Sequence, residues 1–95
     1  GVGNVSLFTI SGMNASGRVW DVSSKTNPRL VDGTLTGNSF SFKQATDTLR
    51  EFFVFNENGF AQPTFIINGK RNRYLGGGYH INGGMMFLKY FKNAS

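Results

Sequence analysis

The sequence has no cysteine, a single histidine and 2 Pro among its 95 residues. Without cysteine the chain can hold no disulfide, no thiolate metal site and no Cys nucleophile, and cysteine usage leaves its redox compartment open. Because His80 is the only imidazole, a His-based metal cluster or catalytic triad cannot be assembled within the chain. The apolar runs fall short of the ~20 residues that a membrane-spanning helix needs. We therefore expect no catalytic, metal-binding or cofactor-binding residues and no membrane span.

The formal net charge of the chain is +5, and acidic residues are absent after Glu57. Six of the basic and aromatic residues beyond that point form a candidate anion-binding surface: Lys70, Arg71, Arg73, Tyr74, Lys89 and Lys92. Basic groups interleaved with rings can bind an anionic glycan or single-stranded nucleic acid. We expect a glycan rather than nucleic acid, because five basic residues are few for a phosphate backbone.

Residues with rings and residues that form turns are abundant, with 10 Phe, 3 Tyr, 1 Trp and 13 Gly. Aromatic side chains favour strands, and turn-forming residues recur every ~8 to 12 residues with no segment of helical period. The pattern predicts an all-β fold, an antiparallel β-sandwich of about six to eight strands. We expect residues 1–95 to be a single β-sandwich domain excised from a longer chain, because the sequence opens on Gly-Val-Gly. Residues 68–95 are a Gly-rich, basic C-terminal segment whose packing the pattern leaves open.

Alternation with period 2 predicts the individual strands. They are expected at residues 4–10, 18–22, 29–31, 39–43, 49–55, 64–67 and 85–92. In the first strand Phe8 and Ile10 share a face, and in the fourth Phe40 and Phe42 point inward. A short amphipathic helix is the alternative for residues 85–92, but Gly84 and the aromatic content favour a strand.

Residues 49–67 are the unit around which we expect the rest of the chain to fold. Asn58-Gly59 supplies the positive backbone dihedrals of a tight turn, which predicts a hairpin between residues 49–55 and the return run 60–67. Pro63 cannot donate to a ladder, so the return strand should be an edge or bulged there.

The strand at residues 49–55 is apolar on both faces. Phe53 and Phe55 fall on one face, and Phe52 and Val54 on the other. A strand of this kind is usually central and covered on both sides, either inside a sandwich or between this domain and a neighbour. We therefore expect Phe53 and Phe55, together with Trp20, to be structural residues.

Glu51 and His80 are the two residues most easily mistaken for catalytic groups. Glu51 lies among apolar residues, as a catalytic carboxylate would, but we expect it to form an ion pair with a basic neighbour instead. His80 lies between Gly-rich stretches and is expected in a turn without a catalytic role.

Five short motifs occur in an order that resembles a known family. They are Val19-Trp20-Asp21-Val22-Ser23, Asn27-Pro28, Gly37-Asn38-Ser39-Phe40-Ser41-Phe42, Thr46-Asp47-Thr48-Leu49-Arg50-Glu51-Phe52 and Gln62-Pro63-Thr64-Phe65-Ile66. Over residues 5–67 the chain resembles the β-rich domain that precedes the peptidase domain in the PorU family, the gingipain-like sortases of the type IX secretion system. The resemblance ends at Ile67, because the remaining residues depart from the family.

The resemblance implies a parent protein at the cell surface or outer membrane of a Gram-negative bacterium, secreted across the inner membrane. Such a parent removes a C-terminal sorting domain from cargo and helps to attach the cargo to lipopolysaccharide. The Cys and His dyad of the family lies in the peptidase domain, and no residue here matches it. The implied function is a non-catalytic accessory domain whose partner is the neighbouring peptidase domain. A binding module that uses the candidate anion-binding surface is the alternative, and a hydrolase with scattered carboxylates is a third.

Overall fold

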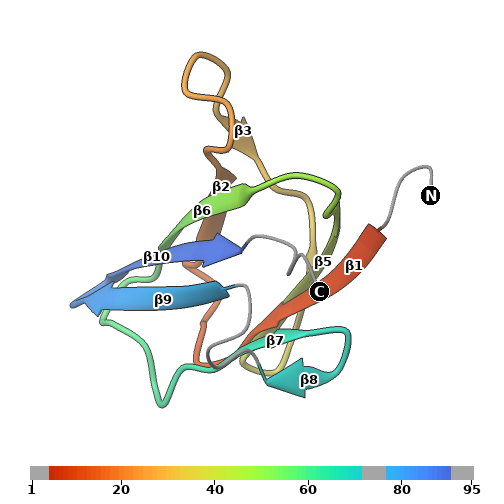
Figure 1. Ribbon diagram of the computed structural model, residues 1–95. Helices are drawn as coiled ribbons and strands as arrows, with labels where there is room; N and C mark the ends of the chain where they lie inside the picture. The colour runs from red at the N-terminus through yellow and green to blue at the C-terminus, as the bar shows by residue number, and fades with distance from the viewer. Residues whose placement is uncertain (1–4, 72–76, 91–95) are drawn as a thin grey trace.

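The computed structural model describes residues 5–71 and 77–90, and these residues form strands, turns and loops without a helix. In chain order the strands are β1 (Val5–Ile10), β2 (Arg18–Asp21), β3 (Arg29–Leu30), β4 (Thr34–Thr36), β5 (Ser39–Ala45), β6 (Arg50–Phe55), β7 (Phe65–Ile67), β8 (Lys70–Arg71), β9 (Gly77–Asn82) and β10 (Met85–Tyr90). All pairings are antiparallel. The first sheet has the order β4-β5-β1-β7-β8 and the second the order β3-β2-β6-β10-β9 (Figure 1). The predicted all-β antiparallel sandwich is confirmed.

The described residues contain ten strands, more than the six to eight expected. The difference comes from short paired segments such as β3 and β8, which have two residues each. Asn68 and Gly69 both have positive φ, 52° and 78°, and close a two-residue turn between β7 and β8. Positive φ at both central residues is the geometry that tight hairpins require, and an Asn-Gly pair adopts it readily.

The predicted hairpin between residues 49–55 and 60–67 is wrong. β6 pairs with β2 and β10 in the second sheet, whereas β7 pairs with β1 and β8 in the first. Asn58 and Gly59 do have positive φ, 65° and 79°, as expected of a turn. The chain turns there but then crosses to the opposite sheet. The geometry of a turn reverses the chain locally, but it does not determine which strand the following segment pairs with. The place beside β6 is taken by β10, whose Met86 and Leu88 bury their side chains completely.

The core lies between the sheets and is built from inward-facing rings and aliphatic side chains. Phe8 is fully buried at its centre, with its ring 5.2 Å from Phe42, 5.4 Å from Phe52 and 5.6 Å from Phe65. All three contacts are edge-to-face, the arrangement that the ring quadrupole favours. Ile10 is also fully buried, which confirms that Phe8 and Ile10 share a face of the first strand.

The C-terminal segment supplies part of this core. Of residues 68–95, the described residues 77–90 form the β9–β10 hairpin, with Gly83 at φ 61° in its turn. β10 pairs along the whole of β6. The strand expected near residues 85–92 is therefore confirmed over Met85–Tyr90. None of the described residues belongs to a helix long and apolar enough to cross a membrane.

Asn56 joins two loops, the one between β1 and β2 and the one after β6. Its side chain is buried, with Oδ1 accepting a hydrogen bond from the Asn14 backbone N–H at 2.9 Å. Its Nδ2 donates to the carbonyls of Gly12 and Gly59. A buried amide that satisfies several backbone groups fixes the loops to which they belong.

Candidate functional site

The outer face of the second sheet carries a row of apolar side chains that crosses four adjacent strands. Leu30 on β3 pairs with Trp20 on β2, Trp20 with Phe53 on β6, and Phe53 with Phe87 on β10. Residues directly opposite on neighbouring strands share a face, so the four side chains stand side by side over about 14 Å. Leu30 is 55 % exposed, Trp20 36 % and Phe53 37 %.

A second row lies beside the first. Phe55 pairs with Met85, and these residues are 41 % and 40 % exposed. The Phe53 ring stacks on Phe55 at 6.0 Å and tilts against Phe87 at 5.3 Å between centroids. We call the set Leu30, Trp20, Phe53, Phe55, Met85 and Phe87 the ring face. It is a contiguous group of exposed apolar side chains with the half-buried Phe87 among them, and such a group in soluble proteins usually marks an interaction surface.

The ring face decides between the two coverings expected for the strand at residues 49–55. Trp20, Phe53 and Phe55 lie on the outside of the sheet, so their face is not covered inside the sandwich. β6 is central in its sheet, as predicted, with β2 and β10 on its two sides. The described residues cover only the face of β6 that carries Phe52 and Val54, both fully buried.

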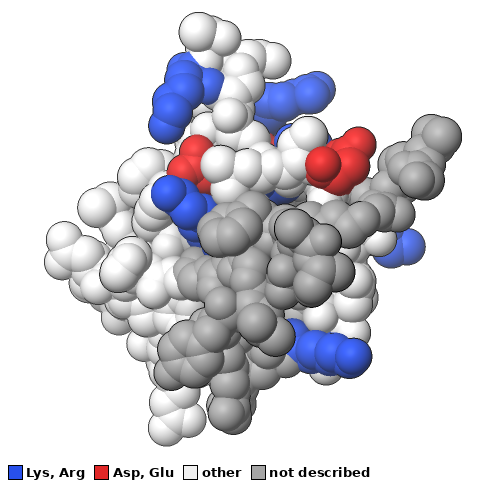
Figure 2. All heavy atoms as spheres, in the orientation of Figure 1, with Lys and Arg blue, Asp and Glu red and all other residues white. Residues whose placement is uncertain are grey.

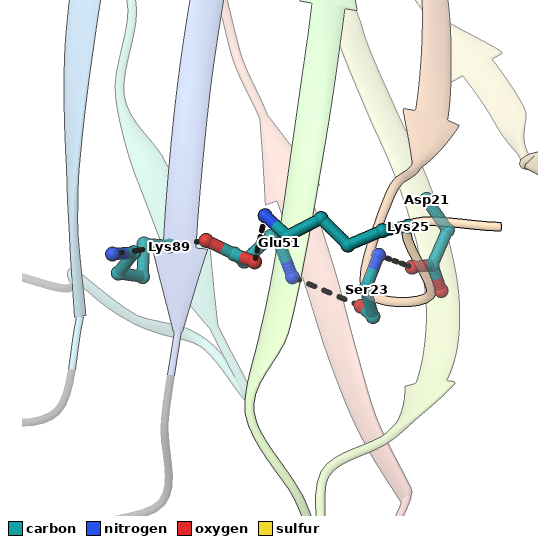
Figure 3. Close-up of polar contacts among 5 residues, drawn as sticks. All are labelled: Asp21, Ser23, Lys25, Glu51 and Lys89. Carbon is teal, nitrogen blue, oxygen red and sulfur yellow. Dashed lines mark hydrogen bonds and ion pairs between the residues drawn. The ribbon is translucent and has the colours of Figure 1, made fainter. Parts of the chain in front are cut away.

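Glu51 lies at one border of the ring face between two lysines (Figure 3). Its carboxylate oxygens are 3.8 Å from Lys25 Nζ and 3.7 Å from Lys89 Nζ. The two lysine side chains approach it from opposite sides and are themselves 86 % and 50 % exposed. The prediction that Glu51 pairs with a basic neighbour is confirmed. Two cations around one carboxylate leave a local excess of positive charge beside the rings.

Backbone contacts hold Glu51 in this position. Its N–H donates to Ser23 Oγ at 3.0 Å, and the Ser23 N–H donates to Asp21 Oδ1 at 2.9 Å (Figure 3). The loop after β2 is thereby fastened to β6, and this loop carries Lys25. A hollow of about 330 Å³ lies between the loop and the rings, with Pro28, Phe53 and Phe87 among its lining residues.

The candidate anion-binding surface predicted from the sequence is spread over both sheets. Lys70 is exposed on β8 of the first sheet, whereas Lys89 is on β10 of the second sheet and pairs with Glu51. Arg71 has its backbone in β8. Arg73, Tyr74 and Lys92 lie outside the described residues. On the face drawn in Figure 2, the basic side chains of the described residues lie apart from one another.

His80 is not in a turn as expected. It lies on β9, opposite Phe87, and is exposed at the end of the first row of the ring face. Within residues 5–71 and 77–90, no group of three or more His, Asp or Glu side chains lies close enough to hold a metal ion.

Sequence reasoning missed Leu30, Met85 and Phe87 as members of the ring face. The alternation in the last strand could have revealed Met85 and Phe87, because they fall on the face opposite to Met86 and Leu88. Two neighbouring strands that are each apolar on both faces produce a surplus apolar surface. That surplus defines a class, a β-sandwich domain with an exposed aromatic sheet face. No protein-family model, no curated protein and no solved structure matches the chain.

Proposed function

We propose that the chain is a non-catalytic accessory domain of a cell-surface, gingipain-like cysteine peptidase, and that it packs against the neighbouring peptidase domain through the ring face. The ring face is the observation that supports this proposal. We propose the identity of the neighbour from the resemblance to the PorU family, which implies a parent at the cell surface or outer membrane.

The composition of the ring face favours a protein partner. Aromatic residues and Met are enriched in the buried centres of protein interfaces, and a polar rim surrounds such centres. Here Trp20 and Phe53 lie in the middle of the row, and Arg18, Lys25 and Lys89 lie around it. Trp at the centre of a patch is the residue type that most often dominates binding energy.

The charges around the ring face indicate what the partner should present. Arg18 is exposed and lies opposite Phe55, while Lys25 and Lys89 share a single carboxylate, Glu51. A complementary partner surface would be apolar at its centre and acidic at its edge.

The binding module considered above is less well supported. Its described members Lys70 and Lys89 belong to different sheets, and Lys89 already has an acidic partner. A single anionic chain would have to span both sheets to contact them.

Oxidative footprinting tests the proposal, because hydroxyl radicals modify Trp, Met and Phe side chains in proportion to their exposure. Trp20 is the only Trp in the chain and therefore gives an unambiguous reading. We expect Trp20 and Met85 to be oxidised readily in the isolated chain and to be protected in the intact parent protein. Leu7, 41 % exposed on the first sheet, is the internal control and should be modified equally in both.

Equal oxidation of Trp20 and Met85 in the two samples would exclude the neighbouring domain as the occupant. Protection in the isolated chain that increases with protein concentration would instead identify a second copy of the chain. Either result refutes the proposal as stated.

A further inference from the structure

A polar cleft lies at one end of the sandwich and shares only Leu30 with the ring face. It has a volume of about 450 Å³, within the ~300 to 1,000 Å³ typical of small-ligand sites. The end of β2, strand β3, the end of β5 and the start of β6 surround it, and we call it the end cleft. Its lining is mainly charged and hydroxyl- or amide-bearing side chains.

The guanidinium of Arg50 lines this cleft and has more N–H donors than acceptors among the described residues. Its Nε donates to the Ala45 carbonyl at 2.7 Å, and its Nη1 is 3.7 Å from Asp21 Oδ2. The second distance is an ion pair, but it is too long for a hydrogen bond. Among the described residues no other acceptor contacts the guanidinium, although only 21 % of the side chain is exposed. Partly buried N–H donors without acceptors favour an oxygen-bearing ligand.

A second guanidinium lies close by. Arg29 pairs with Asp21 across β2 and β3 and therefore shares its face, the face that Asp21 buries toward the other sheet. Arg29 lines the end cleft and has no ion-pair partner among the described residues. Lys43 of β5 lines the cleft from the first sheet.

Two carboxylates, Asp21 and Asp32, line the same cleft. Three cations against two carboxylates leave one positive charge, which suits a ligand with one negative charge better than a dianion. The carboxylates, with Ser24 and Asn27 nearby, also offer acceptors for hydroxyl groups. The chemistry that matches both features is a molecule with one carboxylate and several hydroxyls.

We propose that the end cleft binds a sugar acid, with its carboxylate on Arg29 and Arg50 and its hydroxyls on Asp21 and Asp32. Arginine is suited to this role because its planar fork matches the two oxygens of a carboxylate. The volume accommodates a small unit rather than a polymer groove, so the ligand is a single hexuronic acid or one such residue of a glycan. The residues that would contact the ligand do not belong to the ring face, and the inference does not depend on the docking proposal.

Titration of the ¹⁵N-labelled chain with glucuronate tests the inference by nuclear magnetic resonance. We expect saturable shifts of the amide signals of Ser23, Ser24 and Gln44 at millimolar ligand, and much smaller shifts with glucose or inorganic phosphate. Arg29→Ala should weaken glucuronate binding about tenfold, the usual effect of losing one charge-assisted hydrogen bond. Arg29 is exposed on a two-residue strand, so this variant should keep the dispersed spectrum of the folded chain.

Arg18→Ala is the matched control. It also removes an arginine side chain, but Arg18 lies at the start of β2, at the other end of the strand from Asp21 and the end cleft, so glucuronate binding should be unchanged. Three results would each overturn the inference: no saturable shift with glucuronate, equal binding of glucose or phosphate, or wild-type affinity in Arg29→Ala. None of these results bears on protection of the ring face in the parent protein.

Discussion

Phe52 and Phe53 are neighbours on β6 but lie on opposite faces of the sheet. They therefore provide the sharpest test of which face of β6 is buried in the core. Phe52 is fully buried and meets the rings of Phe8 at 5.4 Å and Phe42 at 5.2 Å. Replacing such a residue with alanine removes its buried area and leaves a cavity, at a typical cost of about 3 to 5 kcal/mol. For a chain of this length the whole free energy of unfolding is about 5 to 14 kcal/mol. Phe52→Ala should therefore remove about a fifth of it or more.

Phe53 is the next residue and should behave differently. It is 37 % exposed, and its contacts with Phe55 and Phe87 are ring pairs of the kind worth about 0.5 to 1.5 kcal/mol. Phe53→Thr keeps a β-branched residue in the strand, so we expect a loss of about 1 kcal/mol.

Urea denaturation followed by circular dichroism measures both variants. With a slope of about 2 kcal/mol per molar urea, the midpoint should fall by about 2 M in Phe52→Ala and by about 0.5 M in Phe53→Thr. A loss in Phe53→Thr as large as that in Phe52→Ala would refute the conclusion that Phe53 lies on a surface, since it would place both rings in a core.

Two further predictions concern polar groups. Asn56→Ala removes the partner of three backbone groups in a buried position and should lower the free energy of unfolding by about 3 kcal/mol in the same assay; a loss below about 1 kcal/mol would show that the loops hold together without this amide. Glu51→Gln should cost no more than about 1 kcal/mol, because the lysines that pair with Glu51 are half or fully exposed, and the loss should shrink in high salt. A salt-independent loss of several kcal/mol would contradict that account of Glu51.

The sequence was sufficient to predict the class of fold. Phe8 and Ile10 alternate with outward residues, and Asn68-Gly69 carries a turn signature whose geometry the structure reproduces. These features are local, because alternation and turn dihedrals depend on neighbours in the chain. Local patterns therefore identified most strands but could not determine which strands pair.

Non-local pairing explains the errors. β6 and β7 are separated by a turn at Asn58-Gly59, yet they join different sheets because β10 occupies the side of β6. The same insertion of β10 aligns Phe87 with Phe53 and creates the ring face. The end cleft depends on pairing in the same way, since Arg29 comes to the face of Asp21 only through the β2–β3 register.

Oxidation of Trp20 in the parent protein, relative to the isolated chain and normalised to Leu7, is the measurement that tests the central claim most directly. If the ring face is covered by a neighbouring domain, the ratio should fall well below one. A ratio of one would mean that the rings remain open to solvent in the parent and that the accessory role through this face is wrong.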